Sequence, residues 1–137
     1  MIRPSEPHDQ PDLDRLAIAQ WQRTPWVDSG ERATHIHVCE RYRARIVGCV
    51  SYRRYLAQIR VINVWVVDGF EGRRAAVELL KNLRDIADSE GSDLFFTVAE
   101  WNRGLRHGVE KYGCEQKAAE GLLPDAVFYR RRSKVLA

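Results

Sequence analysis

The residues best suited to chemistry lie in the segment 64–83, where a strand runs through a tight turn into a helix. Residues 64–67 form the short continuous apolar run typical of a strand covered on both faces, and Gly69 helps to end it. The first amides of the following helix have no internal partner and, with the helix dipole, favour an anion in the turn. Arg73 and Arg74 add guanidinium groups that suit phosphate oxygens. The sequence therefore predicts a binding site for a phosphorylated cofactor at this turn.

The arginine pair also has a simpler interpretation, in which Arg73 and Arg74 are solvated charges at the start of a helix. A helix N-terminus carries partial positive charge, so two cations placed there cost some free energy unless an anion is bound nearby. This cost favours the interpretation that the two arginines bind an anion over the interpretation that they are only solvated charges.

A second set of candidate ligands, His35, His37 and Cys39, would share one face of a strand through its two-residue repeat. These groups could hold zinc or copper, but three ligands without a fourth are a weak signal. Side chains that alternate on a half-exposed strand are the simpler interpretation, so no metal is predicted. The three cysteines are odd in number and unclustered, which predicts free buried thiols rather than disulfides.

The composition is that of one soluble globular domain covering residues 1–137, with 45% hydrophobic and 30% charged residues. No apolar run approaches the length of a membrane helix and the N-terminus has no apolar signal region, so a cytoplasmic location and no membrane partner are expected. The net charge of +3 does not by itself argue for nucleic acid. The basic run from Tyr129 to Lys134 is a better candidate contact, although a terminal run of charges is usually just solvated.

The hydrophobic period and the turn residues predict helices and strands in mixed order. Strands are predicted at Ile2–Arg3, Thr34–Glu40, Arg45–Arg53 (with Ile46, Gly48, Val50 and Tyr52 on one side), Ile59–Val67, Asp93–Val98, Glu115–Ala119 and Ala126–Arg131. Helices are predicted after an N-cap at Asp12, from Arg73 to Glu90 closed by Gly91, and from Arg103 to Tyr112 capped by Asn102, with a loop or short helix at 26–30. Antiparallel hairpins with two crossover helices indicate an α+β or mixed α/β fold rather than a doubly wound parallel sheet.

This order, with a phosphate-type turn after the fourth strand, resembles the GNAT superfamily of acyl-CoA-dependent N-acyltransferases over nearly the whole chain. The opening MIRP looks like the family's first strand, and Arg45-Ile46-Val47-Gly48 looks like the start of its third. The family's cofactor loop, Q/R-x-x-G-x-G/A, falls on residues 71–76, where Glu71 replaces Gln or Arg and Arg74 replaces Gly. The later signature, N-x-x-A followed by lYeklGF, lines up without a gap on residues 102–114. The resemblance implies a mostly antiparallel mixed sheet, flanked by helices and splayed between strands four and five.

The resemblance also implies acetyl-CoA (coenzyme A) as the cofactor. Backbone groups of Val66 and Val67 would pair with the pantetheine arm, and the amides of residues 72–76 would hold the pyrophosphate. The implied cofactor-binding residues are Val66, Val67, Glu71, Gly72, Arg73, Arg74, Ala75, Ala76 and Asn102. Glycine at the position of Arg74 lets the backbone approach the phosphates closely. The arginine would therefore either block the site or swing out and clamp a phosphate itself.

Acyl transfer to an amine needs a base for the nucleophile and an acid for the leaving thiolate. The tyrosine that supplies the acid in the family falls on Val109, which cannot donate a proton, and the fourth strand offers no carboxylate. Tyr112 follows about one helical turn later on the same face and is the candidate substitute. Packing of an amphipathic side chain at a helix end is the alternative for Tyr112, and Glu100 and His107 flank the same region.

Two functions follow from these features. One is an acetyl-CoA-dependent N-acetyltransferase whose amine acceptor could be a small molecule or a protein. The other is a non-catalytic GNAT-like binding or structural protein, for example a virion component, because the divergent GRRAA sequence also resembles small GNAT-like proteins of tailed phages. In that case the basic run of Arg130, Arg131, Arg132 and Lys134 would be the candidate contact for nucleic acid or an acidic partner.

Overall fold

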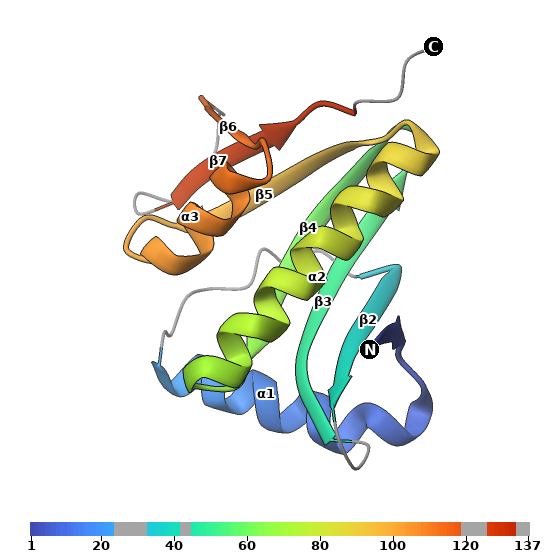
Figure 1. The fold of residues 1–137 in the computed structure, drawn as a ribbon, viewed down its shortest axis with the longest axis vertical. Helices are drawn as coiled ribbons and strands as arrows, with labels where there is room; N and C mark the ends of the chain where they lie inside the picture. The colour runs from blue at the N-terminus through green and yellow to red at the C-terminus, as the bar shows by residue number, and fades with distance from the viewer. Residues whose placement is uncertain (24–32, 42–44, 119–125, 134–137) are drawn as a thin grey trace.

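The structure is a computed structural model that describes residues 1–23, 33–41, 45–118 and 126–133. Within these residues, one seven-stranded sheet has the order β1-β2-β3-β4-β5-β7-β6 (Figure 1). The strands are β1 (Ile2–Pro4), β2 (His35–Arg41), β3 (Arg45–Tyr55), β4 (Gln58–Val66), β5 (Asp93–Ala99), β6 (Glu115–Lys117) and β7 (Ala126–Arg131). The helices are α1 (Gln10–Arg23), α2 (Gly69–Glu90) and α3 (Arg103–Lys111), with a 3₁₀ turn η1 (Pro7–Asp9). Every neighbouring pair is antiparallel except β4 and β5, which confirms the predicted mixed, mostly antiparallel sheet.

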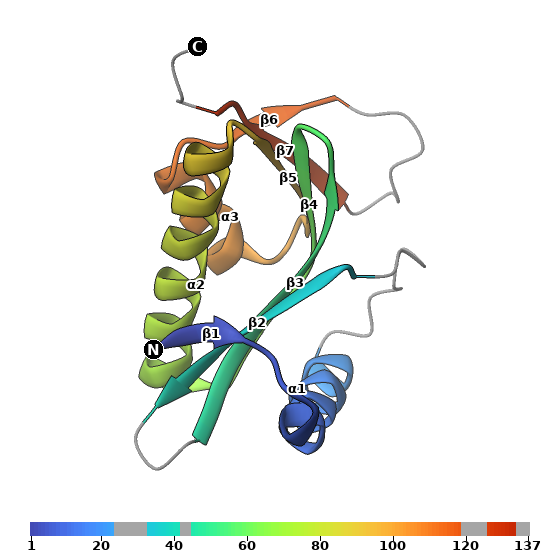
Figure 2. The ribbon, with the colours of Figure 1, turned by 90° about the vertical axis from the view of Figure 1, so that its right-hand side faces the viewer.

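The helices cover the two faces of the sheet unequally. Helices α2 and α3 lie on one face, and α1 lies beside the lower half of the other face (Figure 2). The larger core fills the space under α2 and α3, and its fully buried members include Val50, Ile59, Leu79, Leu83, Val98, Val109 and Tyr129. The smaller core lies under α1 and consists of Leu13, Leu16, Val38, Ile46 and Cys49. Burial of these apolar side chains is the main force that holds the layers together.

Strands β4 and β5 run side by side for only part of their length. Residues 58–61 pair in parallel with residues 93–96. Beyond that point β4 continues to Val66 beside β3, and β5 continues to Ala99 beside β7. The two strands therefore diverge where the resemblance predicted a splay.

Helix α2 begins at Gly69, one turn earlier than the predicted start at Arg73. Gly69 adopts a φ of +85°, which glycine tolerates better than other residues, as the chain turns from β4 into the helix. The first turn carries the exposed side chain of Phe70, so it shows no buried apolar period from which the sequence could have placed it. The helix ends at Glu90 with Gly91 as a left-handed C-cap, as predicted.

The predicted alternation of side chains along β3 is observed only beyond a β-bulge near the start of the strand. Cys39 pairs with Gly48 and Glu40 pairs with Ile46, which leaves Val47 as the extra residue. Ile46 therefore joins the core under α1, whereas Val47 joins the core under α2, the reverse of the predicted faces. A register shift of this kind depends on the partner strand, so the alternation of apolar and polar residues along β3 does not reveal it.

The N-cap predicted at Asp12 is wrong, because α1 begins at Gln10 directly after η1 and contains Asp12 in its first turn. Asp9 instead accepts a hydrogen bond from the amide of Glu6 at 2.8 Å and two from the guanidinium of Arg3 at 2.8 and 2.9 Å. The Arg3 guanidinium lowers the pKa of the buried Asp9 carboxyl to about 2. This ion pair joins β1 to the start of α1, so the entry into the helix is set by a partner outside the helix.

Of the two interpretations of the basic run, a candidate contact or solvated charge, solvation is wrong for Arg131, which is buried on the predicted strand. Arg130 and Arg131 belong to β7, and the side chain of Arg131 is only 2% exposed because it pairs with Asp88 of α2. Arg130 pairs with Asp93 of β5 at 2.6 Å, and Arg132 is exposed. Lys134 and the predicted loop or helix at 26–30 lie outside the described residues.

The three cysteines, Cys39, Cys49 and Cys114, are free and buried, as predicted. Burial raises the pKa of the Cys49 and Cys114 thiols to about 12, so both are protonated at neutral pH. Among the described residues, no helix has the length and apolar character needed to cross a membrane.

Candidate functional site

Val66 and Val67, the two predicted strand residues, lie at the divergent end of β4. Val66 is half-buried and pairs with Gly48 of β3. The amide of Val67 donates to the carbonyl of Val47 at 2.9 Å, so it is directed toward β3. Both side chains pack against the core under α2. The end of β4 is therefore held by β3 on one side and leads directly into α2.

At Gly72 the start of α2 lies directly against the backbone at the end of β4. A Cβ atom at this position would lie 1.6 Å from the carbonyl oxygen of Val67, a distance that no side chain can occupy. Ala75, one turn later, is also fully buried. These small residues let the start of the helix rest directly on the strand end.

The amides that open α2 belong to Gly69, Phe70 and Glu71. Because the helix begins at Gly69, the amides of residues 73–76 donate to carbonyls four residues earlier, inside the helix. Asp68, the N-cap residue, has an extended backbone, and within the described chain its side chain forms no capping hydrogen bond. The opening amides and the helix dipole thus make the turn before α2 attractive to an anion, three residues upstream of the expected position.

The side chains around this turn carry both signs of charge, with Arg45, Arg73 and Arg74 near the carboxylates of Asp68 and Glu71. Arg73 and Arg74 are exposed in the second turn of α2. The Arg74 guanidinium lies 5.9 Å from the centroid of the Phe70 ring, so its side chain runs back toward the start of the helix. Glu71 pairs with Arg45 of β3 at 3.5 Å, an exposed contact worth little to stability. Whether Arg74 clamps a phosphate or blocks the site stays a prediction.

Asn102 is the N-cap of α3, as predicted. Its Oδ1 accepts a hydrogen bond from the amide of Leu105 at 3.2 Å, and its own amide donates to the carbonyl of Ala99 at the end of β5. These contacts fix Asn102 where β5 diverges from β4.

Sequence reasoning missed Arg106, which holds the loop between β5 and α3. Its Nη1 donates to the carbonyl of Glu100 at 3.0 Å and its Nε donates to the Tyr129 hydroxyl at 3.0 Å. The same hydroxyl donates to Glu110 at 2.8 Å. A shallow depression at this loop is lined by Glu100, Trp101, Arg103 and Arg106. Tyr129 lies on β7, far away in sequence, so no local pattern could have revealed the contact.

Tyr112 lies apart from the residues predicted to hold the cofactor. It is the C-cap residue of α3, packs against the larger core, and has the Arg84 guanidinium 5.3 Å from its ring centroid. Arg84 is fifteen residues beyond Gly69, or about 20 Å along the axis of α2. Val109, at the family's tyrosine position, is 1% exposed within the core. These contacts match the packing alternative, and the catalytic role of Tyr112 stays a prediction.

The side chains of His37 and Cys39 face α2 rather than each other. His37 lies between the Asn82 side chain and the Tyr52 hydroxyl, 3.3 Å from each, and the Cys39 thiol donates to Glu78 at 3.5 Å. In the described part of the chain, no three His, Cys, Asp or Glu side chains lie close enough together to hold a metal ion.

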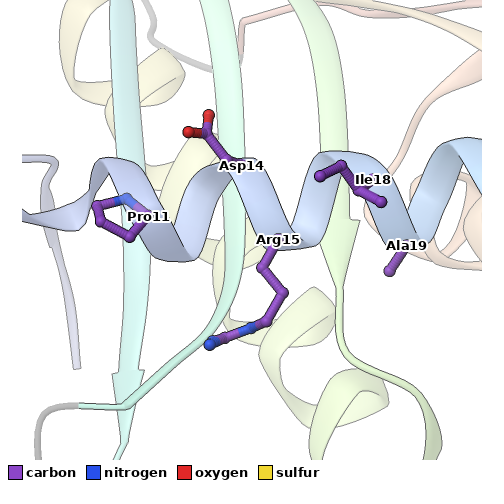
Figure 3. Close-up of a pocket in the computed structure, with 5 residues that line it drawn as sticks. All are labelled: Pro11, Asp14, Arg15, Ile18 and Ala19. Carbon is purple, nitrogen blue, oxygen red and sulfur yellow. The ribbon is translucent and has the colours of Figure 1, made fainter.

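A second shallow depression lies on the outer surface of α1, lined by Pro11, Asp14, Arg15, Ile18 and Ala19 (Figure 3). Arg15 pairs with Asp12 on the same helix at 2.8 Å. None of these residues belongs to the turn before α2 or to the divergent strand ends.

The solved structures similar to this chain include acetyltransferases. The chain resembles yncA from Salmonella typhimurium, solved with its cofactor acetyl-CoA, at 15% identity and a TM-score of 0.75, over 96% of this chain and 92% of the other. It resembles a mutant of the spermidine N-acetyltransferase SpeG from Vibrio cholerae at 14% identity and a TM-score of 0.73, with the same coverage. It also resembles N-acetylglutamate synthase from Neisseria gonorrhoeae, complexed with coenzyme A and N-acetyl-glutamate, at 17% identity and a TM-score of 0.69, over 96% of this chain and 34% of the other. At these identities the likeness shows the fold.

The family itself is shown by sequence. No curated protein matches the chain significantly. The model of the acetyltransferase (GNAT) family, however, matches residues 2–113, which include the β4–α2 turn and α3. Because that match covers most of the chain and agrees with the divergence of β4 and β5, the chain belongs to the acetyltransferase (GNAT) family.

Proposed function

We propose that this protein is an acetyl-CoA-dependent N-acetyltransferase that acts on an amine. The observation that carries the proposal is the divergence of β4 and β5 directly beside the start of α2. Two extended strand ends and a helix N-terminus at one place can accommodate a ligand with both amide groups and phosphates. Membership of an acetyltransferase family and the acetyl-CoA and coenzyme A in two related structures support the same cofactor.

The residues at this place fit the two parts of acetyl-CoA. Beyond Val61, the ladder between β4 and β5 has ended, so the pantetheine arm could lie along β4 as an added strand near Val66, Val67 and Asn102. The opening amides of α2 would hold the pyrophosphate. Further contacts in the proposed site come from Glu71, Gly72, Arg73, Arg74, Ala75 and Ala76. Bound acetyl-CoA would supply the acetyl group as a reactive thioester.

Catalysis in this proposal rests mainly on alignment of the two reactants. Holding an amine against a bound thioester removes much of the entropic barrier without a protein acid. Val109 cannot act as an acid, and Tyr112, which packs beside Arg84, remains the candidate substitute. The protein is therefore expected to work best on amines that are already neutral.

Acetyl transfer is tested by incubating the full chain with labelled acetyl-CoA and a panel of small amines, peptides with free N-termini and lysine peptides. We expect release of coenzyme A above the hydrolysis background with at least one acceptor, and a rate that rises with pH as the acceptor amine loses its proton. Release that never exceeds the background, in a protein that binds acetyl-CoA, would favour the rival function, a non-catalytic GNAT-like binding or structural protein.

Cofactor binding is tested separately by calorimetry with coenzyme A. The Arg74→Glu variant is expected to bind about 10- to 100-fold more weakly, because a charge-assisted phosphate contact is lost and a negative charge replaces it. Lys81→Glu is the matched control, because Lys81 is exposed two turns further along α2. Equal affinities for Arg74→Glu and the unmodified protein would exclude Arg74 as a phosphate contact.

A further inference from the structure

The turn between β5 and α3 is shaped by backbone hydrogen bonds between close neighbours in the chain. The amide of Asn102 donates to the carbonyl of Ala99 at 2.9 Å, and the amide of Arg103 donates to the carbonyl of Trp101 at 2.9 Å. The amide of Arg106 donates to the carbonyl of Asn102 at 3.0 Å and so begins the hydrogen bonding of α3. These bonds set the shape of the turn but do not connect it to a distant part of the fold.

The side chain of Arg106 makes that connection. Its Nη1 donates to the carbonyl of Glu100 in the turn, and its Nε donates to the hydroxyl of Tyr129 on β7, both at 3.0 Å. Tyr129 is fully buried in the core under α2 and α3, so its hydroxyl is a fixed point. A guanidinium is planar and its N–H donors have fixed directions. Arg106 therefore sets where Glu100 lies relative to Tyr129.

The Tyr129 hydroxyl is held by two residues of α3 that lie on one face of the helix. It accepts from Arg106 and donates to the carboxylate of Glu110, four residues later, at 2.8 Å. Both hydrogen bonds have a charged partner, which makes them stronger than bonds between neutral groups. Glu110 is exposed, whereas Arg106 is half-buried, so water competes less for the contact with Arg106. Arg106 is thus the better-fixed partner of Tyr129.

The turn held by Arg106 carries Asn102, which belongs to the proposed acetyl-CoA site. Ala99, the last residue of β5, pairs with Ala126 of β7, and the turn follows directly beside α3 (Figure 1). The ladder between β4 and β5 has already ended at this point. Glu100 is only two residues before Asn102, so a displacement of the Glu100 carbonyl also moves Asn102.

We propose that Arg106 is a positioning residue for acetyl-CoA. Through the carbonyl of Glu100 and the hydroxyl of Tyr129, it holds Asn102 at the distance from β4 that the pantetheine arm requires. The inference rests on the proposed acetyltransferase function and assigns a role to a residue outside the cofactor site itself. In this role Arg106 acts on the binding of the cofactor and not on the transfer step.

Calorimetry of the full chain with coenzyme A tests the effect on binding. Arg106→Met removes both side-chain hydrogen bonds and keeps a long apolar side chain. We expect affinity to fall about 10-fold or more, because displacing a binding group by a small distance loses most of its contribution. With acetyl-CoA and an acceptor, KM for acetyl-CoA should rise by a similar factor, while kcat changes by less than about threefold.

Arg103→Met is the matched control for the loss of charge. Arg103 is exposed in the first turn of the same helix, and within the described residues its side chain forms no hydrogen bond. Its affinity for coenzyme A should stay within about twofold of the unmodified protein. An equal loss in Arg103→Met and Arg106→Met would reduce the effect to general attraction of the phosphates and would overturn the inference.

Two further variants separate positioning from a merely structural role, which would lower stability without changing the affinity of the folded molecules. Arg106→Lys keeps the charge and one donor, so it should recover part of the affinity. Tyr129→Phe removes only the hydroxyl and keeps the buried ring, so it should also weaken binding, and it replaces Arg106→Met if that variant does not fold. The double variant of Arg106→Met and Tyr129→Phe should bind no more weakly than Arg106→Met alone, because both changes break one connection. Multiplied losses would contradict the inference.

Hydrogen exchange measured by NMR locates the effect in the turn. The amides of Asn102 and Leu105 donate to the carbonyl of Ala99 and to Oδ1 of Asn102. Both amides should exchange faster in Arg106→Met than in Arg103→Met, and coenzyme A should slow them in the unmodified protein. Exchange at these amides that is the same in both variants would overturn the inference.

Binding by the unmodified protein distinguishes failure of this inference from failure of the proposed function. If the unmodified protein binds coenzyme A and Arg106→Met binds it equally well, Arg106 does not position the site and the proposed acetyl transfer is unaffected. If the unmodified protein does not bind coenzyme A, the proposed function fails and this inference fails with it.

Discussion

Replacing Gly72 with alanine is expected to destabilise the protein by about 2–4 kcal/mol. The added Cβ would lie 1.6 Å from the Val67 carbonyl oxygen and 2.7 Å from its carbon, and both are backbone atoms that no rotamer change can move. The start of α2 would have to lift from the end of β4. Urea unfolding of the variant and the unmodified protein measures the loss.

The same displacement should weaken coenzyme A binding, because the opening amides of α2 would move relative to β4. Gly104→Ala is the matched control, since a Cβ at Gly104 in α3 meets nothing within 4 Å. Alanine is also the better helix former, so this variant should keep or gain up to about 1 kcal/mol. Similar stabilities for both variants would show that the contact between Gly72 and Val67 does not hold the helix in place.

Replacing Arg131 with methionine is expected to cost about 2–4 kcal/mol of stability. The Arg131 side chain is 2% exposed, donates to both carboxylate oxygens of Asp88 at 2.8 and 3.0 Å, and donates through Nε to the carbonyl of Tyr112 at 2.8 Å. Methionine fills a similar volume, but it leaves these acceptors without their guanidinium donor. The loss should lie toward the lower end of the range, because Asp88 is 30% exposed and water can reach it.

Arg132→Met is the control for this experiment, because Arg132 is exposed and should change stability by no more than about 0.5 kcal/mol. Thermal or urea unfolding distinguishes the two variants. Adding Asp88→Leu to Arg131→Met should recover part of the loss, since the double variant has no carboxylate left at that position. If Arg131→Met and Arg132→Met behave alike, the ion pair between β7 and α2 contributes nothing measurable.

Local signals in the sequence were sufficient wherever the physical cause is local. The strand Ala126–Arg131 was predicted with its observed bounds, because its alternating side chains share one buried face. Gly91 and Asn102 were identified as the residues that end α2 and cap α3, because capping depends on a backbone conformation or a nearby side chain. The order of elements and the motifs on them were enough to predict the family's fold.

Contacts between residues that are far apart along the chain could not be predicted from the sequence. The bulge at Val47 depends on the register of β2, and the role of Asp9 depends on Arg3 in another strand. The basic run was interpreted as either a partner contact or solvated charge, because nothing near Arg131 in the sequence reveals its partner Asp88. In each case the feature depends on a contact between residues that only folding brings together.

The candidate site shows the same division. The sequence by itself determined the strand–turn–helix unit, because hydrophobic period and turn residues are local properties of the chain. Only the tertiary structure decided that α2 starts at Gly69, that Tyr112 packs beside Arg84, and that Arg106 reaches Tyr129 of β7. A helix start without a buried face depends on how separate segments pack, and so does a contact formed across strands. Neither has a signature within a single segment of the sequence.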